Sequence, residues 1–218
     1  MNVDQKTTEK LWGIVSRLPF QSPYLIELNS ENKISPRDYF ENSVSQFVLE
    51  LGSGWGEVAV ELARKNPNTG FILMEKNRDR LEVTIREIEK YKLKNIRLLC
   101  CNFNWFLKEL FLENSFDKII LNFPDPWPKK KHWHNRTLNS EFLDTVHFLL
   151  KPKGKFLFAT DHGGYGRVAI RTFRKSFLFK PVNSEYVFIR KEFPISKFER
   201  EKQLENKTIY YLERERVD

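Results

Sequence analysis

The sequence predicts an α/β fold: a mostly parallel seven-stranded sheet with helices on both faces and an antiparallel hairpin at one edge. Three observations lead to this prediction. From residue 46 onward, short apolar runs rich in β-formers alternate with helical patterns. A glycine cluster follows the first run, as expected where a strand turns sharply into a helix. The last two β-prone runs have no clear helical pattern between them, which is typical of an antiparallel hairpin.

In the first half of the pattern, each strand is followed by a helix. The strands are expected at 46–51, 71–74 and 96–101. The helices are expected at 57–65, from the capping residue Asn77 to Tyr91, and at 105–112. The helix capped by Asn77 carries Leu81, Ile85, Ile88 and Tyr91 on one face, which predicts that this face is buried.

The second half continues the alternation and then changes. A strand at 117–122 leads into a proline-rich loop, and a helix at 138–150 precedes a strand at 155–160. A helix is expected at 163–177. The β-prone runs at 186–189 and 208–212 are the two strands of the expected hairpin.

The charge balance suggests a polyanionic partner. Thirty-seven Lys and Arg against 29 Asp and Glu give a net charge of +8, which suits nucleic acid or an anionic membrane; a solvated basic surface is the alternative. The apolar stretches are strand-sized, and residues 1–10 are polar, so we expect a cytoplasmic protein without a membrane span. Cys100 and Cys101 are adjacent, and we expect them to be reduced thiols.

The glycine cluster Gly52-Ser53-Gly54-Trp55-Gly56 suits a ligand that lies against main-chain N–H groups. Its G-x-G-x-G spacing differs from the dinucleotide fingerprint, and a tight turn without a ligand is the alternative. Glu50, just before the loop, would repel a pyrophosphate but suits an ammonium group. Glu75, at the end of the second strand, can accept both hydroxyls of a ribose. These features favour S-adenosylmethionine over NAD.

Asn102 closes the third expected strand, where such a sheet would contact the adenine of this cofactor. Its amide can accept a hydrogen bond from the adenine amine. An Asx turn at the end of the strand is the alternative.

The loop after the fourth strand, residues 122–136, is the most informative stretch. Three prolines in five residues stiffen it and hold Asp125 and Trp127 near the expected methyl donor. The basic run that follows contains aromatic side chains, as single-stranded nucleic acid requires; a solvated basic loop is the alternative. His132 and His134 lack accompanying carboxylates or cysteines, so we assign no metal.

Three motifs resemble the bacterial tRNA (guanine-N7)-methyltransferase family, and the resemblance runs from about residue 40 to the end. They are L-E-L-G-S-G-W-G at 49–56, F-P-D-P-W-P-K-K at 123–130 and S-K-F-E at 196–199. The resemblance implies a Rossmann-like class I methyltransferase fold with S-adenosylmethionine as donor and tRNA as partner. It implies one domain over 1–218, with an N-terminal extension at 1–39 and a catalytic core at 40–218, as a monomer or homodimer.

The resemblance also implies the site residues. Donor contacts are expected at Glu50, Gly52, Gly54, Glu75, Asn102 and Asp125. Contacts with tRNA or guanine are expected at Lys129, Asp161, Ser196, Lys197, Phe198 and Glu199. The chain departs from the family pattern at Asn102, where Asp is usual, and at Ser196, where Thr is usual. A third departure is the basic run at 131–136, which in the family is typically richer in Arg. Without the resemblance, Asp161 would also fit the N-cap of the next helix.

The chemistry needs alignment more than a base, because guanine N7 has a free lone pair and no proton. Positive charge moves onto the purine as the methyl transfers, so a fixed carboxylate at Asp125 stabilises the transition state. The resemblance implies that the target is a guanine in the variable loop of tRNA. Two alternatives remain: an exocyclic-amine methyltransferase, whose loop Asp125-Pro126-Trp127 partly imitates, and a non-catalytic RNA-binding module on the same fold.

Overall fold

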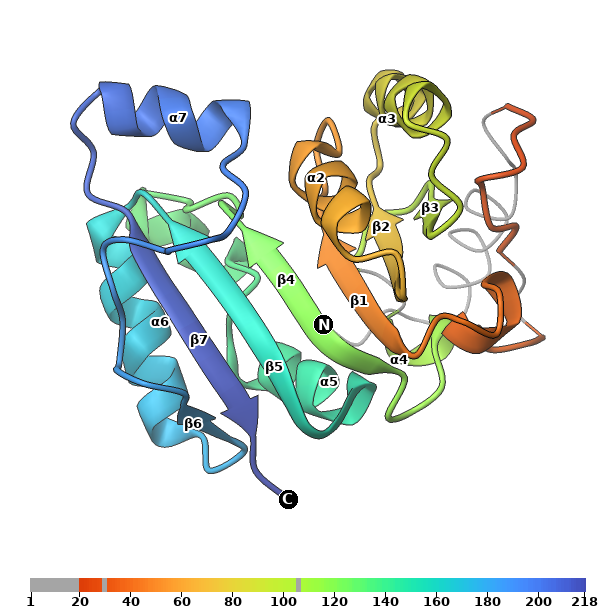
Figure 1. Cartoon of the computed structure of the whole chain (residues 1–218). Coiled ribbons are helices and arrows are strands. Elements are labelled where there is room, and N and C mark those ends of the chain that lie inside the picture. Colours follow the sequence, from red (N-terminus) through yellow and green to blue (C-terminus); the bar gives the residue numbers. More distant parts are fainter. Residues whose placement is uncertain (1–19, 29–30, 105–106) are drawn as a thin grey trace.

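The computed structural model describes residues 20–28, 31–104 and 107–218, and its centre is one seven-stranded sheet. The strand order is β3-β2-β1-β4-β5-β7-β6. Neighbouring strands from β3 to β5 run parallel, whereas β7 is antiparallel to both β5 and β6 (Figure 1). The mostly parallel sheet with an antiparallel edge is therefore confirmed.

The strands and helices alternate along the chain as follows. The strands are β1 Gln46–Leu51, β2 Thr69–Met74, β3 Ile96–Leu99, β4 Phe116–Asn122, β5 Leu150–Thr160, β6 Phe179–Pro181 and β7 Tyr210–Arg216. The α-helices are α2 Glu57–Lys65, α3 Arg78–Lys90, α4 Leu107–Leu110, α5 Ser140–Leu149, α6 Gly163–Lys175 and α7 Lys197–Leu204. Two 3₁₀ helices are η1 Pro36–Tyr39 and η2 Lys130–Asn135.

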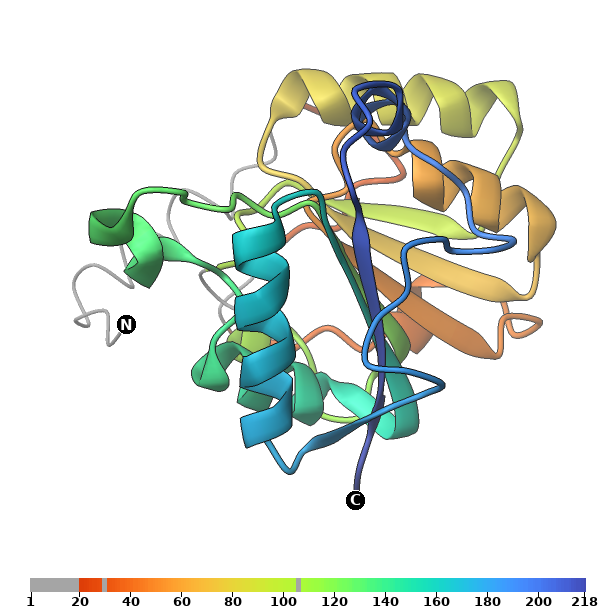
Figure 2. The ribbon, with the colours of Figure 1, turned by 90° about the vertical axis from the view of Figure 1, so that its left-hand side faces the viewer.

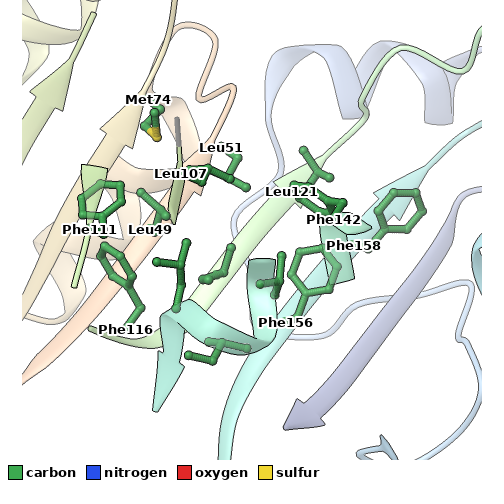
Figure 3. Close-up of a cluster of buried hydrophobic side chains, with 14 of the residues drawn as sticks. Leu49, Leu51, Met74, Leu107, Phe111, Phe116, Leu121, Phe142, Phe156 and Phe158 are labelled. Carbon is green, nitrogen blue, oxygen red and sulfur yellow. The ribbon is translucent and has the colours of Figure 1, made fainter. Parts of the chain in front are cut away.

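Helices cover both faces of the sheet, and the two-residue period of the strands explains why. In β1, Leu49 and Leu51 point to the face covered by α4, α5 and α6, whereas Val48 points to the face covered by α2 and α3. Figure 2 shows these two helical layers on opposite sides of the sheet. Phe116, Phe156 and Phe158 fill the first layer together with leucines of β1 and β4 (Figure 3).

The strand order reverses at β1, which lies between β2 and β4. In an open parallel sheet such a switch point leaves a crevice at the carboxyl ends of the two central strands, and ligands bind there. The glycine loop leaves β1 at this end, and the proline-rich loop leaves β4 at the same end. The fold therefore brings the two predicted functional loops together.

The antiparallel edge differs in detail from the expected hairpin. Residues 186–189 do not form a strand; only Val187 makes an isolated bridge, to Tyr211. The rings of Tyr186 and Phe188 pack on Tyr210 at 5.5 and 5.4 Å, so this run forms an aromatic cluster instead of a ladder. The edge strand is β6, and helix α7 separates it from β7.

Smaller differences concern the ends of elements. Strand β3 ends at Leu99, two residues earlier than expected, and β5 begins at Leu150 because residues 151–154 continue the strand. The described part of the helix expected at 105–112 runs from 107 to 110, and Trp105 lies outside the described residues. Helix α6 ends at Lys175, two residues earlier than expected.

Part of the segment before residue 40 packs on the sheet. Ile26 and Ile34 are buried in the same core as Leu49, and Leu25 forms a parallel bridge with Leu98 at the edge of β3. This segment therefore covers the β3 edge. Among the described residues, no helix is both long and apolar enough to span a bilayer.

Candidate active site

The glycine loop turns sharply between β1 and α2. Gly52, Gly54 and Gly56 have φ angles of 67°, 60° and 74°, a region that side chains rarely allow. A Cβ on Gly56 would lie 2.5 Å from Cγ2 of Thr84, so this glycine lets α2 approach α3. A Cβ on Gly54 would meet nothing within 4 Å, so the loop presents bare backbone to open space. This is the surface that a ligand against the main chain requires.

Glu75 follows β2, and its carboxylate holds the glycine loop in place. Its Oε2 accepts a hydrogen bond from the Gly54 amide at 3.0 Å, and its Oε1 accepts one from the Asn77 amide at 2.8 Å. Arg80 lies 3.6 Å from Oε2, and the side chain is buried. Each carboxylate oxygen has a second lone pair, so the group can still accept ribose hydroxyls.

Glu50 lies inside β1 with only 4% of its surface exposed. Its Oε2 has no hydrogen-bond partner among the described residues. Burial raises the pKa of this carboxyl group to about 8; nearby Glu57 acts in the same direction, and Arg190 and the Ala59 amide oppose it. A buried acid with an open oxygen is a strong acceptor for a cationic group.

Two further buried polar atoms lie at the carboxyl ends of β1 and β4. Ser53 Oγ in the glycine loop and Asn122 Nδ2 at the end of β4 have no partner among the described residues. Buried polar groups are nearly always hydrogen-bonded, so such exceptions favour a missing ligand or water. Together with Glu50, they fit a cofactor that carries an amine and hydroxyls.

Asn102 lies three residues beyond the end of β3 and is half-buried. Its Oδ1 accepts a hydrogen bond from the Asn104 amide at 3.1 Å, which is the Asx turn weighed as an alternative. This bond restrains the side chain at the carboxyl edge of the sheet. An adenine contact at Asn102 stays a prediction.

The loop after β4 is held in an unusual backbone conformation. Phe123 and Trp127 have φ angles of 51° and 42°, each of which costs about 1–2 kcal/mol in a bulky residue. The Phe123 amide donates to the Ala159 carbonyl at 2.8 Å, and Arg136 Nε donates to the Pro126 carbonyl at 2.8 Å. Strain retained by such bonds is typical of functional loops.

Asp125 occupies the exposed middle of this loop. It forms no hydrogen bond or ion pair with any residue that the structure describes, and its charge faces Tyr165 of α6. Lys129, Lys130 and Lys131 are exposed, and Trp133 is 45% exposed beside them. Figure 2 shows η2 projecting beside the upper end of α6. The loop thus offers a free carboxylate next to basic and aromatic side chains.

The S-K-F-E motif begins helix α7, beyond the carboxyl ends of β4 and β5 (Figures 1 and 2). Ser196 Oγ caps the helix by accepting from the Glu199 amide at 3.1 Å. The Lys197 amide donates to Glu57 at 3.0 Å, and Phe198 is 43% exposed with its ring 5.1 Å from that of Phe123. Glu199 is 1% exposed. Two motif residues therefore anchor the helix, and two face outward.

Asp161 follows β5 and is half-buried near the same edge. It is not the N-cap of α6, so that alternative is wrong: His162 Nδ1 accepts from the Tyr165 amide at 3.0 Å. Asp161 is thus left available for another partner.

Sequence reasoning missed the partners of the motif residues. Glu199 accepts hydrogen bonds from Tyr211 Oη at 2.5 Å and from Arg190 at 3.2 Å. Arg190 also donates to Asn122 Oδ1 at 3.2 Å. The sequence feature that could have pointed to this cluster is Arg190, a charged residue directly after the apolar run at 186–189.

No group of three or more His, Cys, Asp or Glu side chains that could hold a metal occurs in the described part of the chain. Cys100 and Cys101 are free thiols, and burial raises the pKa of Cys101 to about 12. Neither sulfur is positioned as a reactive thiolate.

The fold and the loops at its switch point define a class I methyltransferase. Residues 45–212 match a family model described as a putative methyltransferase. A tRNA (guanine-N(7)-)-methyltransferase of Leptospira interrogans serovar Lai is 53% identical over 210 residues, covering 96% of this chain and 97% of that protein. The protein of the same name from Thermotoga maritima is 38% identical over 62% of this chain and 43% of its own. The chain belongs to the tRNA (guanine-N7)-methyltransferase family.

Solved structures support the fold. The 16S rRNA methyltransferase KamB has a TM-score of 0.61 at 13% identity, over 84% of this chain and 91% of its own. TrmN from Thermus thermophilus has a TM-score of 0.57 at 20% identity, over 80% of this chain and 45% of its own. At such identities the likeness concerns the fold alone.

Proposed function

We propose that this chain transfers a methyl group from S-adenosylmethionine to N7 of a guanine in the variable loop of tRNA. The proposal depends on two carboxylates at the switch point, one at the end of β1 and one in the loop after β4. Glu50 is buried with an open oxygen, and Asp125 is exposed on a rigid loop with no partner among the described residues. The family membership supports both the donor and the substrate.

The donor fits the chain's own side chains as follows. Glu50 would bind the ammonium group, the backbone at Gly52 and Gly54 would lie against the ligand, and Glu75 would accept the ribose hydroxyls. Asn102 would contact the adenine. When bound, S-adenosylmethionine supplies a methyl group on a sulfonium centre. The open space at Gly54 and the unpartnered Glu50 oxygen support this placement.

Transfer requires a correctly placed guanine. The N7 lone pair forms the new bond to the methyl carbon as the carbon–sulfur bond breaks, and no proton leaves N7. The purine becomes positively charged. Asp125 stabilises this charge and orients the ring through its N1–H and amino group, and Asp161 supplies a second acceptor.

The substrate side offers contacts of a different kind. Lys129, with its neighbours Lys130 and Lys131, would position phosphates, and Lys197 would do so from α7. The half-exposed rings of Phe198 and Trp133 are stacking surfaces for unpaired bases. Ser196 and Glu199 would contact tRNA or guanine from the start of α7, which their side chains also hold in place. Action as a monomer or homodimer in the cytoplasm, and activity without a metal, belong to the same proposal.

The decisive experiment identifies the methylated atom. Bulk tRNA is incubated with the purified chain and methyl-labelled S-adenosylmethionine, and the nucleosides are separated. We expect label in 7-methylguanosine, and strand cleavage by borohydride and aniline at one position in the variable loop. Label on an exocyclic amine would favour the amine-methyltransferase alternative. Donor binding without label in any tRNA pool would favour the non-catalytic module.

A further inference from the structure

Arg190 is a nearly buried cation at the junction of three elements. It lies in the connection between β6 and α7, and its side chain is 13% exposed. It donates to Asn122 Oδ1 at the end of β4 and to Glu199 Oε2 on α7, each at 3.2 Å. Its guanidinium stacks over Phe193 at 3.7 Å and over Tyr211 at 4.8 Å from the ring centroids. A buried cation is unfavourable unless partners compensate its charge, so the hydrogen bonds and ring contacts of Arg190 are needed to hold it here.

Two buried carboxylates face this one cation. Glu199 is fully engaged, since Tyr211 Oη donates to one of its oxygens and Arg190 to the other. Glu50 interacts with the charge of Arg190 but keeps an oxygen without a partner among the described residues. With Glu50 and Glu199 both ionised, their two negative charges exceed the single positive charge of Arg190 by one. A second cation bound at Glu50 would balance it.

We propose that Arg190 is a positioning residue for methyl transfer, which favours the ionised form of Glu50 and locks the start of α7 to the end of β4. This inference rests on the proposed function, because the cation that completes the cluster is the donor. Arg190 acts through Glu50 on the donor side and through Glu199 on the substrate side. Its hydrogen bonds to Asn122 and Glu199 therefore join the two halves of the active site.

The charges around the cluster define the expected pH dependence. Arg190 and Glu57, which lies at the start of α2, face Glu50. Glu199 of α7 and Tyr211 of β7 face Arg190. Arg190 favours the ionised form of Glu50, and Glu57 opposes it. Donor affinity should therefore rise with pH as Glu50 loses its proton, up to the pH at which the donor's own ammonium group is deprotonated.

The test compares donor binding by calorimetry between pH 6 and 9.5 in four chains. Arg190→Met removes the charge and keeps much of the length; Arg190→Lys keeps the charge. Arg174→Met is the matched control, because Arg174 makes an ion pair with Glu185 while its side chain is 62% exposed. We expect Arg190→Met to move the midpoint of the pH profile up by about 1 unit or more, and to weaken binding about tenfold at pH 7.5.

The other variants should behave differently. Arg190→Lys should return the midpoint close to that of the parent, and Arg174→Met should match the parent throughout. The KM for tRNA should rise in Arg190→Met, because α7 is no longer held. A folded Arg190→Met protein with the parental midpoint, or with equal weakening at every pH, would overturn the proposal.

A second variant keeps the test valid if Arg190→Met fails to fold. Glu199→Gln removes a negative charge from the same cluster, so the midpoint should move down instead of up. An unchanged or raised midpoint in Glu199→Gln would contradict the proposal. The pH midpoints of all these variants need only donor binding. They therefore stand apart from the proposed function, which fails when the parent chain leaves no label on guanine N7.

Discussion

The two sides of the active site are built in opposite ways. On the donor side, Glu75 is buried, and both of its carboxylate oxygens already accept backbone N–H groups of the loops they support. On the substrate side, Asp125 and Lys129 are exposed, and Asp125 makes no hydrogen bond within the described residues. The expected donor side is thus preorganised by the fold, whereas the exposed groups of the expected substrate side are left for bound RNA to complete under the proposed function.

The difference follows from the size and charge of the two ligands. A small cationic donor must be recognised by a few buried groups, because burial strengthens each electrostatic contact. A tRNA presents many phosphates to an exposed surface, where single contacts are weak and their number matters. Variants on the donor side should therefore change donor affinity sharply. Variants on the substrate side should change rate or salt dependence.

Asp125→Asn should have the largest effect and would show that the exposed carboxylate acts on the transition state. The variant keeps the shape of the side chain and most of the tRNA affinity. Its single-turnover rate of methyl transfer should fall by about 10²-fold or more, as for loss of one preorganised charge. Asp144→Asn, on the exposed side of α5, is the matched control and should retain the parental rate. A rate near that of the parent would remove Asp125 from the chemistry.

Glu75→Ala should weaken S-adenosylmethionine binding by ~1.5–3 kcal/mol, a tenfold to hundredfold change, because it removes a charged hydrogen-bond acceptor. Part of the loss comes from the amides of Gly54 and Asn77, which lose their partner. Calorimetric titration measures the effect. Glu82→Ala, in a partly exposed ion pair with Arg78, is the control and should bind normally. Parental affinity in folded Glu75→Ala would refute the assignment.

Replacing Lys129, Lys130 and Lys131 by Ala should weaken tRNA binding about tenfold at low salt. It should also reduce the slope of log affinity against log salt by up to ~2–3, because fewer counterions are released. Donor affinity should not change. The control replaces the exposed residues Lys90, Lys92 and Lys94 around the end of α3, which gives the same net charge. If both triple variants bind alike, the loop is only a solvated surface.

The fold was largely predictable because local patterns carry it. The apolar run at 46–51 and the glycines after it require a buried strand and a tight turn in any fold of this class. The strand predicted at 186–189 was wrong because the rings of this run pack on Tyr210 beside the sheet. An apolar β-prone pattern does not show whether a run pairs as a strand or packs through its side chains.

Only those site residues that lie in a recognisable sequence motif could be predicted. Asp125 is marked by its prolines, and Glu75 by its place after a strand. The burial of Glu199 depends on Arg190 and Tyr211, which come from a connection and from the last strand. Such a cluster forms only in the folded chain, because no local pattern joins its members.

Glu50→Gln tests whether the donor side is preorganised at a cost in stability. Burial raises the pKa of Glu50 from 4.5 to about 8 in the folded chain, so the folded state binds the proton more tightly than the unfolded state. The contribution of Glu50 to stability is therefore fully present below pH 4.5, declines as pH rises and is lost above pH 8. Gln does not titrate. Thermal unfolding should show similar Tm values for parent and variant at pH 4, and at pH 9 a higher Tm for the variant, by about 2–4 °C for each kcal/mol recovered. The same variant should lose donor affinity, because its neutral amide cannot balance an ammonium group. Parallel Tm profiles across this pH range would mean that Glu50 is ionised in the folded chain well below pH 8, and that its open oxygen costs the fold little.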